Sequence, residues 1–289
     1  MAGEPQEIAA PGPISVIGAG AMGAGIAQVA VRSGFEVLLV DPAAGAVDRA
    51  LGAITKGLRR WSEKGEISRE AAERACERVR GVSIDELGKA IAVIEAIVEN
   101  VETKDRLFRD LDAVLPAGAL LASNTSSISI TRLGAATRRP GDVVGLHFFN
   151  PVPVMTLIEI VRGLKTSDAT VRRAEALARA LGKTPVVVQD APGFVSNRIL
   201  MPMINEAIFA LEEGVATRDA IDQVMELGMR HPMGPLKLAD LIGLDVCLFI
   251  LEVLHRDLGD PKYRPCPLLR RKVAAGELGK KTGRGFYEY

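Results

Sequence analysis

Residues 14–23 read Ile14-Ser15-Val16-Ile17-Gly18-Ala19-Gly20-Ala21-Met22-Gly23, a short β-rich run that passes directly into the pattern G-x-G-x-x-G. In this pattern the first glycine allows a tight turn, the second lets the backbone approach a pyrophosphate, and the third lets helix and strand pack closely. Helical spacing continues to about Ser33, and Gly34 ends it. A helix that begins at the loop presents free N–H groups to phosphate oxygens. The stretch therefore predicts a dinucleotide-binding strand, loop and helix.

Asp41 adds a second signal of the same kind. It ends an apolar strand predicted at residues 35–40 and lies 41 − 23 = 18 positions beyond the last glycine of the loop. A carboxylate there accepts hydrogen bonds from the adenosine ribose hydroxyls and repels a 2′-phosphate, which favours NAD over NADP. The alternative is structural: a glycine turn, followed by an aspartate that caps a helix before Pro42.

Strand-like and helical segments continue to alternate up to about residue 189. Because some of the strands are continuously apolar, we expect a mostly parallel sheet that is covered on both faces. Further strands are predicted at residues 92–97, 119–123, 143–148, 157–161 and 185–188, and helices at 43–64, 68–80, 101–115 and 168–181. The rest of the chain has almost only helical patterns. The sequence thus predicts an α/β, Rossmann-type domain over residues 1–190 and an all-α domain over residues 191–289.

Composition limits the possible partners. The 289 residues include 36 basic and 36 acidic side chains, and a net charge of zero argues against non-specific binding to nucleic acid or membranes. Acidic residues interrupt the apolar stretch 236–254, so a buried helix is expected there instead of a membrane span. The three cysteines form neither a disulfide framework nor a metal-ligand pattern, which favours a cytoplasmic protein without a metal. Residues 1–13 match neither a signal peptide nor a transit sequence.

His147 lies in an apolar, proline-stiffened segment, with Glu159 twelve positions beyond it. Histidine changes its charge nearest to neutral pH, so it suits taking and returning a proton. A carboxylate near its far ring nitrogen fixes the tautomer and stabilises the imidazolium. The two residues are a candidate acid/base pair, although a buried structural histidine is the commoner case.

Two further polar residues lie where an α/β fold places its ligands. Ser126 belongs to Ser123-Asn124-Thr125-Ser126-Ser127, just past an apolar strand, and ligands in open sheets bind beyond the carboxyl ends of strands. Asn197 opens the first long C-terminal helix. Helix capping is the structural alternative for both residues.

With these motifs the chain resembles the L-3-hydroxyacyl-CoA dehydrogenase family, most of all its short bacterial 3-hydroxybutyryl-CoA dehydrogenases. The matching segments follow the family's order at residues 16–23, 122–127, 147–153, 190–198 and 279–287. The resemblance implies an NAD-dependent oxidoreductase that acts on an acyl-CoA substrate, and a homodimer. It also implies a catalytic set that consists of Ser126, His147, Glu159 and Asn197. Glu159 lies in an otherwise apolar strand, where an unpaired carboxylate is costly to bury, and a histidine partner explains its presence.

The resemblance extends to contacts with NAD and coenzyme A. The implied NAD contacts are Gly18, Gly20, Met22, Gly23, Asp41, Glu99, Lys104, Asn124, Ser126, Asn150 and Lys281. Alternatively, Glu99 and Lys104 are an exposed pair at a helix start, and Lys281 is a solvated charge in the tail. Ser126 and Asn197 are expected to contact the substrate. Lys64 matches a basic residue that the family uses for coenzyme A, whereas Gly57 stands where a serine is expected.

Three functions remain open on the sequence alone. The first is oxidation of an (S)-3-hydroxyacyl-CoA, with His147 taking the hydroxyl proton while Ser126 and Asn197 donate hydrogen bonds to substrate oxygens. The second keeps the fold but changes the substrate to 3-hydroxyadipyl-CoA or to a sugar acid such as L-gulonate. The third is a non-enzymatic NAD-binding protein of the crystallin type. The presence of all four candidate catalytic residues argues against the third.

Overall fold

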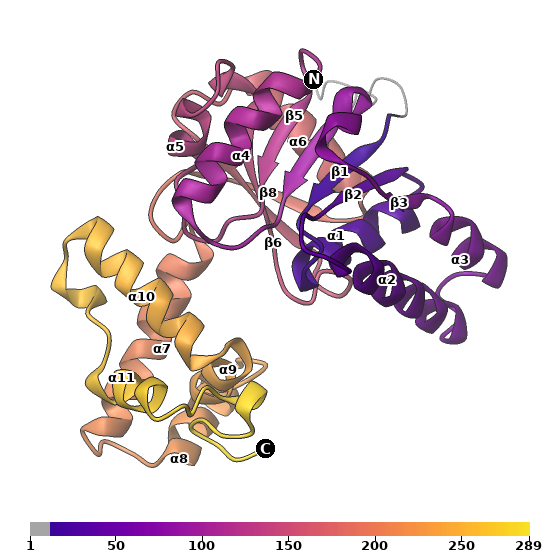
Figure 1. Cartoon of the computed structure of the whole chain (residues 1–289). Coiled ribbons are helices and arrows are strands. Elements are labelled where there is room, and N and C mark those ends of the chain that lie inside the picture. Colours follow the sequence, from indigo (N-terminus) through magenta and orange to yellow (C-terminus); the bar gives the residue numbers. More distant parts are fainter. Residues whose placement is uncertain (1–11) are drawn as a thin grey trace, which may run out of the picture. The chain divides into compact units, whose positions relative to one another are not determined.

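The structure is a computed structural model that describes residues 12–289 (Figure 1). The chain divides into two compact units, one that ends at Asp190 and one that begins at Ala191. Each unit has a hydrophobic core of its own. The sequence predicts no targeting signal in residues 1–13. Of these, residues 1–11 lie outside the described residues.

An eight-stranded sheet forms the centre of the N-terminal unit. Its strand order is β3-β2-β1-β4-β5-β6-β7-β8, and every neighbouring pair is parallel except β6 with β7. The chain order reverses beside β1, and ligands of open α/β sheets bind at such a point. The elements are β1 (Ile14–Ile17), α1 (Ala21–Arg32), β2 (Val37–Val40), α2 (Ala46–Glu63), α3 (Arg69–Cys76), β3 (Val79–Gly81), β4 (Ala92–Glu95), α4 (Val101–Val114), β5 (Leu120–Ser123), α5 (Ile130–Ala135), β6 (Val143–Phe148), β7 (Leu157–Arg162), α6 (Asp168–Ala180) and β8 (Thr184–Gln189).

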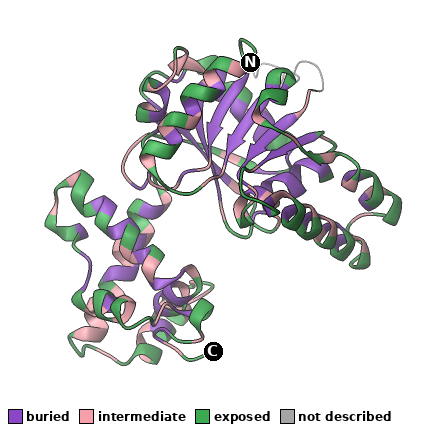
Figure 2. Cartoon of the chain, viewed as in Figure 1, coloured by how far each residue is buried: buried purple, intermediate pink, exposed green. Residues whose placement is uncertain are grey.

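The central strands are buried on both faces, and Figure 2 shows them as the buried middle of this unit. Side chains alternate between the faces, so Val16 packs in one cluster with Ile26 of α1 and Ala174 of α6. On the opposite face, Ile130 of α5 lies against Gly145 of β6. The predicted Rossmann-type, mostly parallel sheet is therefore confirmed.

One predicted helix is too long. The pattern at residues 68–80 predicts a single helix, but α3 ends at Cys76, and Val79–Gly81 form the edge strand β3 beside β2. A three-residue strand whose middle residue is Arg80 has too short a pattern to distinguish it from the end of a helix. Pairing with β2 decides its conformation: the Val37 N–H donates a hydrogen bond to the Arg78 carbonyl at 2.7 Å.

The C-terminal unit is helical, as predicted, and its core includes the buried faces of α7 and α10. Met201, Ile204 and Ile208 recur at helical spacing on α7 and belong to one cluster with Leu251 of α10. Gly243 separates α9 from α10, so the apolar stretch 236–254 forms two helices. Within residues 12–289, none of the helices has both the length and the apolar character needed to cross a membrane. The helices of this unit are α7 (Ser196–Glu212), α8 (Arg218–Gln223), α9 (Pro235–Ile242), α10 (Leu244–Leu258) and α11 (Pro267–Ala274).

Candidate active site

The three glycines of the first loop differ in what surrounds them. Gly18 has φ +102°, and a Cβ there would lie 2.4 Å from the Ala96 carbonyl oxygen. A Cβ on Gly23 would lie 1.7 Å from the Gly18 carbonyl oxygen, so this position must be glycine for helix and strand to pack. A Cβ on Gly20 would meet nothing within 4 Å, and Gly20 supplies no side-chain cap to α1. Packing therefore does not require glycine at position 20, and the open space beside it, at the start of α1, leaves room for a pyrophosphate.

Asp41 is held at the end of β2 by two backbone groups. Its Oδ2 accepts a hydrogen bond from the Ala19 N–H in the glycine loop, and its Oδ1 accepts one from the Ala43 N–H, both at 2.8 Å. The N-cap of α2 is Gly45, so the alternative in which Asp41 caps this helix is wrong. A fixed carboxylate beside the glycine loop suits the ribose of a dinucleotide. Met22, in the first turn of α1, packs against the core cluster.

A buried group of charges lies at the carboxyl ends of β4 and β5. Lys104 of α4 is 1% exposed, and its Nζ lies 3.0 Å from Glu95 Oε1 and 2.7 Å from Glu99 Oε2. The fully buried Glu95 also accepts hydrogen bonds from the Ile97 N–H at 2.7 Å and from the Ser123 hydroxyl at 2.6 Å. The alternative of an exposed charge pair at a helix start is therefore wrong for Lys104.

Glu99 is hydrogen-bonded to loop 124–127, which follows β5. It accepts hydrogen bonds from the Thr125 hydroxyl, from the Ser126 N–H at 3.1 Å and from the Ser127 hydroxyl at 3.0 Å. Burial raises the pKa of Glu99, but the positive charge of Lys104 and the hydrogen bonds from Lys104, Thr125 and Ser127 outweigh it and bring the pKa below 4.5. The residue is therefore a carboxylate at neutral pH.

Loop 124–127 is also joined to the end of β6. Asn124 Oδ1 accepts a hydrogen bond from the Phe148 N–H at 2.9 Å, beside His147. The side chain that caps α5 is that of Ser129, so helix capping does not explain Ser126. Asn150 is exposed in the turn that follows β6. The residues expected along the far half of the cofactor thus meet at adjacent strand ends.

His147 and Glu159 face each other across β6 and β7. They are direct partners in the antiparallel register, and His147 Nδ1 lies 2.7 Å from Glu159 Oε2. Both side chains are buried, and the ring of Phe149 lies 4.7 Å from the histidine ring, centre to centre. With Nδ1–H donating to the carboxylate, Nε2 of the ring is the atom that can accept a proton.

The remaining predicted residues lie farther along the chain or at the surface. Asn197 is buried in the first turn of α7, whose N-cap is Val195, so Asn197 does not cap this helix. Lys281 Nζ lies 2.7 Å from Asp245 Oδ2, so this charge is paired and not simply solvated. Lys64 is exposed directly after α2.

At Gly57 of α2, a Cβ would lie 2.4 Å from the side-chain oxygen of Gln28 on α1. Gln28 therefore takes the space into which a serine at position 57 would project.

Two residues that hold other parts of this region in place, Glu95 and Lys183, are not among the site residues predicted from the sequence. Glu95 stands in the apolar run 92–97, and a carboxylate in an apolar strand is the signal that singles out Glu159. Lys183, after α6, donates hydrogen bonds to the carbonyl oxygens of Val152 and Met155, both at 2.6 Å. No sequence pattern links this lysine to a turn about thirty residues earlier.

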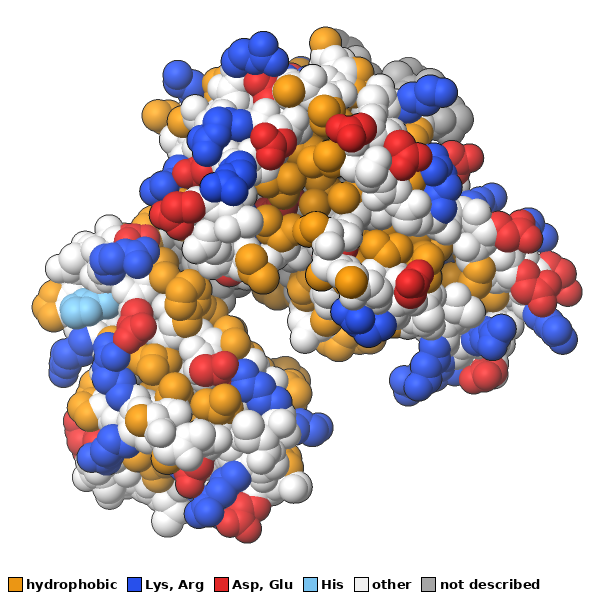
Figure 3. Space-filling view, in the orientation of Figure 1, with side chains coloured by type: hydrophobic (Ala, Val, Ile, Leu, Met, Phe, Trp, Pro, Cys, Tyr) orange, Lys and Arg blue, Asp and Glu red, His pale blue; other side chains and the backbone are white. Residues whose placement is uncertain are grey.

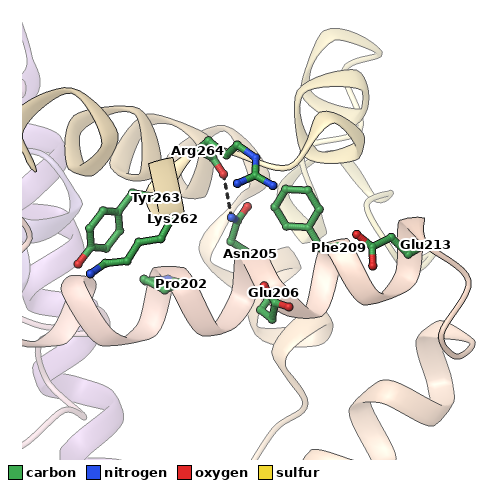
Figure 4. A pocket seen from close by; sticks show the side chains of 8 residues that line it. All are labelled: Pro202, Asn205, Glu206, Phe209, Glu213, Lys262, Tyr263 and Arg264. Atoms are coloured by element: carbon green, nitrogen blue, oxygen red, sulfur yellow. Dashed lines mark hydrogen bonds between the residues drawn. The ribbon is translucent and has the colours of Figure 1, made fainter. Parts of the chain in front are cut away.

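Apart from these residues, the C-terminal unit contains a cavity of about 560 Å³ between α7 and the segment 262–264. Figure 4 shows its lining, in which the Asn205 side chain donates a hydrogen bond to the Arg264 carbonyl at 3.0 Å. None of the predicted site residues lines it. The part of the chain that the structure describes contains no group of three or more His, Cys, Asp or Glu side chains placed to hold a metal ion.

Comparisons with known proteins agree over nearly the whole chain. A family model described as "3-hydroxyacyl-CoA dehydrogenase, NAD binding domain" matches residues 13–191, and one described as "3-hydroxyacyl-CoA dehydrogenase, C-terminal domain" matches residues 193–289. The chain is 54% identical to a probable 3-hydroxybutyryl-CoA dehydrogenase of Bacillus subtilis, over 96% of each chain. It is 52% identical to the 3-hydroxybutyryl-CoA dehydrogenase of Bradyrhizobium diazoefficiens, over 96% of this chain and 94% of that protein. Among solved structures, the (S)-3-hydroxybutyryl-CoA dehydrogenase PaaH1 of Ralstonia eutropha is 47% identical, with a TM-score of 0.94 over 97% of this chain and 99% of that one.

Proposed function

Because this chain belongs to the 3-hydroxyacyl-CoA dehydrogenase family, we propose that it interconverts (S)-3-hydroxybutyryl-CoA and acetoacetyl-CoA. It is an oxidoreductase, and NAD is its cofactor. The substrate is proposed from the names of its relatives, which are 3-hydroxybutyryl-CoA dehydrogenases. The observation that carries the chemistry is the 2.7 Å contact between the His147 ring and the Glu159 carboxylate, at the end of a strand in an NAD-binding unit.

His147 is the proposed acid/base residue. Bound NAD supplies the acceptor for the hydride that leaves C3 of the substrate. His147 Nε2 takes the proton of the 3-hydroxyl group, and the electron pair of the O–H bond forms the new C=O bond. Glu159 keeps Nδ1 protonated and stabilises the imidazolium. In the reverse direction the imidazolium returns its proton to the ketone oxygen.

Ser126 and Asn197 have a different proposed role. A hydroxyl group and an amide can both donate hydrogen bonds to substrate oxygens as negative charge develops there. Ser126 belongs to the N-terminal unit and Asn197 to the C-terminal unit. We therefore expect catalysis to require residues of both units.

The test follows absorbance at 340 nm, the band of reduced nicotinamide, with acetoacetyl-CoA as substrate and NADH or NADPH in separate samples. We expect NADH to be consumed and NADPH to be used far more slowly, because the Asp41 carboxylate repels a 2′-phosphate. Rapid use of NADPH would contradict the role of Asp41. Turnover of L-gulonate but not of acetoacetyl-CoA would contradict the proposed substrate, and so would absence of turnover with both.

Homodimerisation is a further proposal. The helical unit has exposed apolar side chains at Ile199, Leu227, Met229, Leu241 and Phe249. Figure 3 shows hydrophobic surface among mixed charges on the viewed face of this unit. Burying such apolar surface against a second copy of the chain lowers the free energy of the protein in water. Sedimentation velocity is expected to give twice the mass of one chain, 30.8 kDa.

We further propose that coenzyme A binds near Lys64 and that the protein acts in the cytoplasm. Lys64 offers an exposed positive charge at the end of α2, which suits a phosphate of the coenzyme. The free thiols of Cys76, Cys247 and Cys266 agree with a reducing compartment. Lys64→Ala should raise the KM for acetoacetyl-CoA with little change in kcat.

A further inference from the structure

The charges around Lys104 do not cancel. One ammonium group lies between two carboxylates, at 3.0 Å from Glu95 and 2.7 Å from Glu99. Besides its contact with Lys104, the Glu95 carboxylate accepts a hydrogen bond from the Ile97 N–H at 2.7 Å and lies 2.6 Å from the Ser123 hydroxyl. Two negative charges and one positive charge give the cluster a net charge of −1.

This cluster of Glu95, Glu99 and Lys104 lies on the half of the sheet beyond β1. In a dinucleotide-binding sheet, the first half holds the adenosine end and the strands beyond the order reversal hold the other end. The glycine loop follows β1 and Asp41 follows β2, whereas the cluster lies at the ends of β4 and β5. Glu99 is also bonded to the backbone of Ser126, the proposed substrate contact. The cluster therefore belongs to the nicotinamide end of the site.

Oxidised and reduced nicotinamide differ by one charge at that end. The ring of NAD⁺ is positive and the ring of NADH is neutral. A buried net charge of −1 attracts only the positive ring, and low-dielectric surroundings weaken this attraction less than water does. Because Glu95 is fully buried, surrounding salt screens its charge little.

We propose that the Glu95–Lys104–Glu99 cluster sets the relative affinity for NAD⁺ and NADH by adding one negative charge beside the nicotinamide. Glu95 contributes through this charge and through holding Lys104, and it is a positioning residue that touches neither substrate nor cofactor. This inference rests on the proposed NAD-dependent function, since it assumes that the far end of the sheet binds the nicotinamide.

The first test is Glu95→Gln, which keeps the shape of the side chain and makes the cluster neutral. Kd for NADH is measured by the fluorescence of the bound nucleotide, and Kd for NAD⁺ by competition with NADH. We expect the ratio Kd(NAD⁺)/Kd(NADH) to rise. A unit charge at about 10 Å, with an effective dielectric constant of about 20 to 40, corresponds to roughly a 4- to 15-fold change.

The matched control restores the charge without restoring the contacts. The double variant Glu95→Gln, Lys104→Gln leaves Glu99 as the charged member, so the net charge is again −1. If charge sets the ratio, the double variant returns towards the wild-type value. If the effect of Glu95→Gln is a distortion of loop 124–127, the double variant departs from the wild type at least as far as the single one, which overturns the proposal.

Two further results are informative. If Glu95→Gln does not fold, as judged by circular dichroism, Glu99→Gln makes the same change of charge at a partly exposed position and should raise the ratio in the same way. A folded single variant with the wild-type ratio would overturn the proposal while leaving the proposed function intact. A wild-type protein that binds neither nucleotide would overturn the cofactor assignment, and the proposal with it.

Discussion

Glu159 has Ile158 and Ile160 as neighbours in β7, and all three side chains are buried. A carboxylate in such a strand needs a partner, and the ring of His147 is within hydrogen-bond distance. Replacing His147 with Gln keeps a polar side chain but removes the proton acceptor. We expect kcat to fall by about 10²- to 10⁴-fold, with the KM for NADH nearly unchanged.

The control for this variant is His255→Gln, at an exposed position on α10. Its kcat should match that of the wild type. Steady-state rates at 340 nm with acetoacetyl-CoA compare the two variants, and a near-normal kcat in His147→Gln would rule out its role as the acid/base residue.

Glu99 leads to a prediction about pH and stability. Its pKa in the folded protein lies below its ordinary value, because Lys104 and the hydrogen bonds outweigh burial. Such a carboxylate stabilises the fold above the ordinary pKa of about 4.5, and the contribution is lost as pH falls through the folded value. In urea unfolding, the wild type should therefore exceed Glu99→Gln in free energy of unfolding at pH 7, and the difference should shrink between pH 5 and pH 3. A difference that grows in acid would contradict the ionised Glu99.

The buried carboxylates of Glu159 and Glu95 show which contacts of single residues can be predicted from the sequence. Glu159 could be found because a histidine of matching chemistry stands at the end of another predicted strand. Glu95 has the same apolar surroundings, but its partner Lys104 lies on the following helix, and nothing in the spacing indicates that this lysine turns inward. Burial of a charged side chain depends on tertiary contacts, which a single sequence does not display.

At the scale of elements, the turn between β6 and β7 depends on Lys183. Its Nζ donates to the carbonyl oxygens of Val152 and Met155, and the side chain is largely buried. Lys183→Met leaves both carbonyl groups without this donor, so we expect the free energy of unfolding to fall by about 1–3 kcal/mol. Urea unfolding measures the loss.

The exposed Lys165 provides the matched control, because Lys165→Met removes a charge at the surface. That variant should stay within about 0.5 kcal/mol of the wild type. Equal effects of the two substitutions would mean that the Lys183 hydrogen bonds do not stabilise the turn.

The same contrast between local and distant causes explains which elements could be predicted. The central strands are continuous apolar runs, so their own residues specify them. β3 has three residues and takes its conformation from hydrogen bonds to β2, which lies about forty residues earlier. The antiparallel direction of β7 is likewise absent from its own sequence, because a run such as 157–161 fits either direction.

At the scale of the whole molecule, within residues 12–289 one hydrophobic cluster centres on the sheet of the N-terminal unit and another on α7 and α10, and these two clusters share no residue. NAD at a concentration of about 100 times its Kd raises the free energy of unfolding of the unit that binds it by roughly 2.7 kcal/mol. We expect hydrogen exchange of the slowest amides in β1, β4 and β5 to slow by up to about 100-fold when NAD is added. Core amides of α7 and α10 should slow much less, and equal slowing in both units would mean that they unfold as one.

The register of β6 and β7 has a consequence for how this fold can change over evolution. His147 and Glu159 are opposite each other in the antiparallel register of β6 and β7. An insertion at the exposed tip of segment 149–156, near Val154, leaves the pair opposed as long as the strands keep this register, whereas one residue deleted within β7 turns the carboxylate to the other face of the sheet. Descendants of this chain can therefore vary the length of the tip while they inherit the same histidine–carboxylate pair.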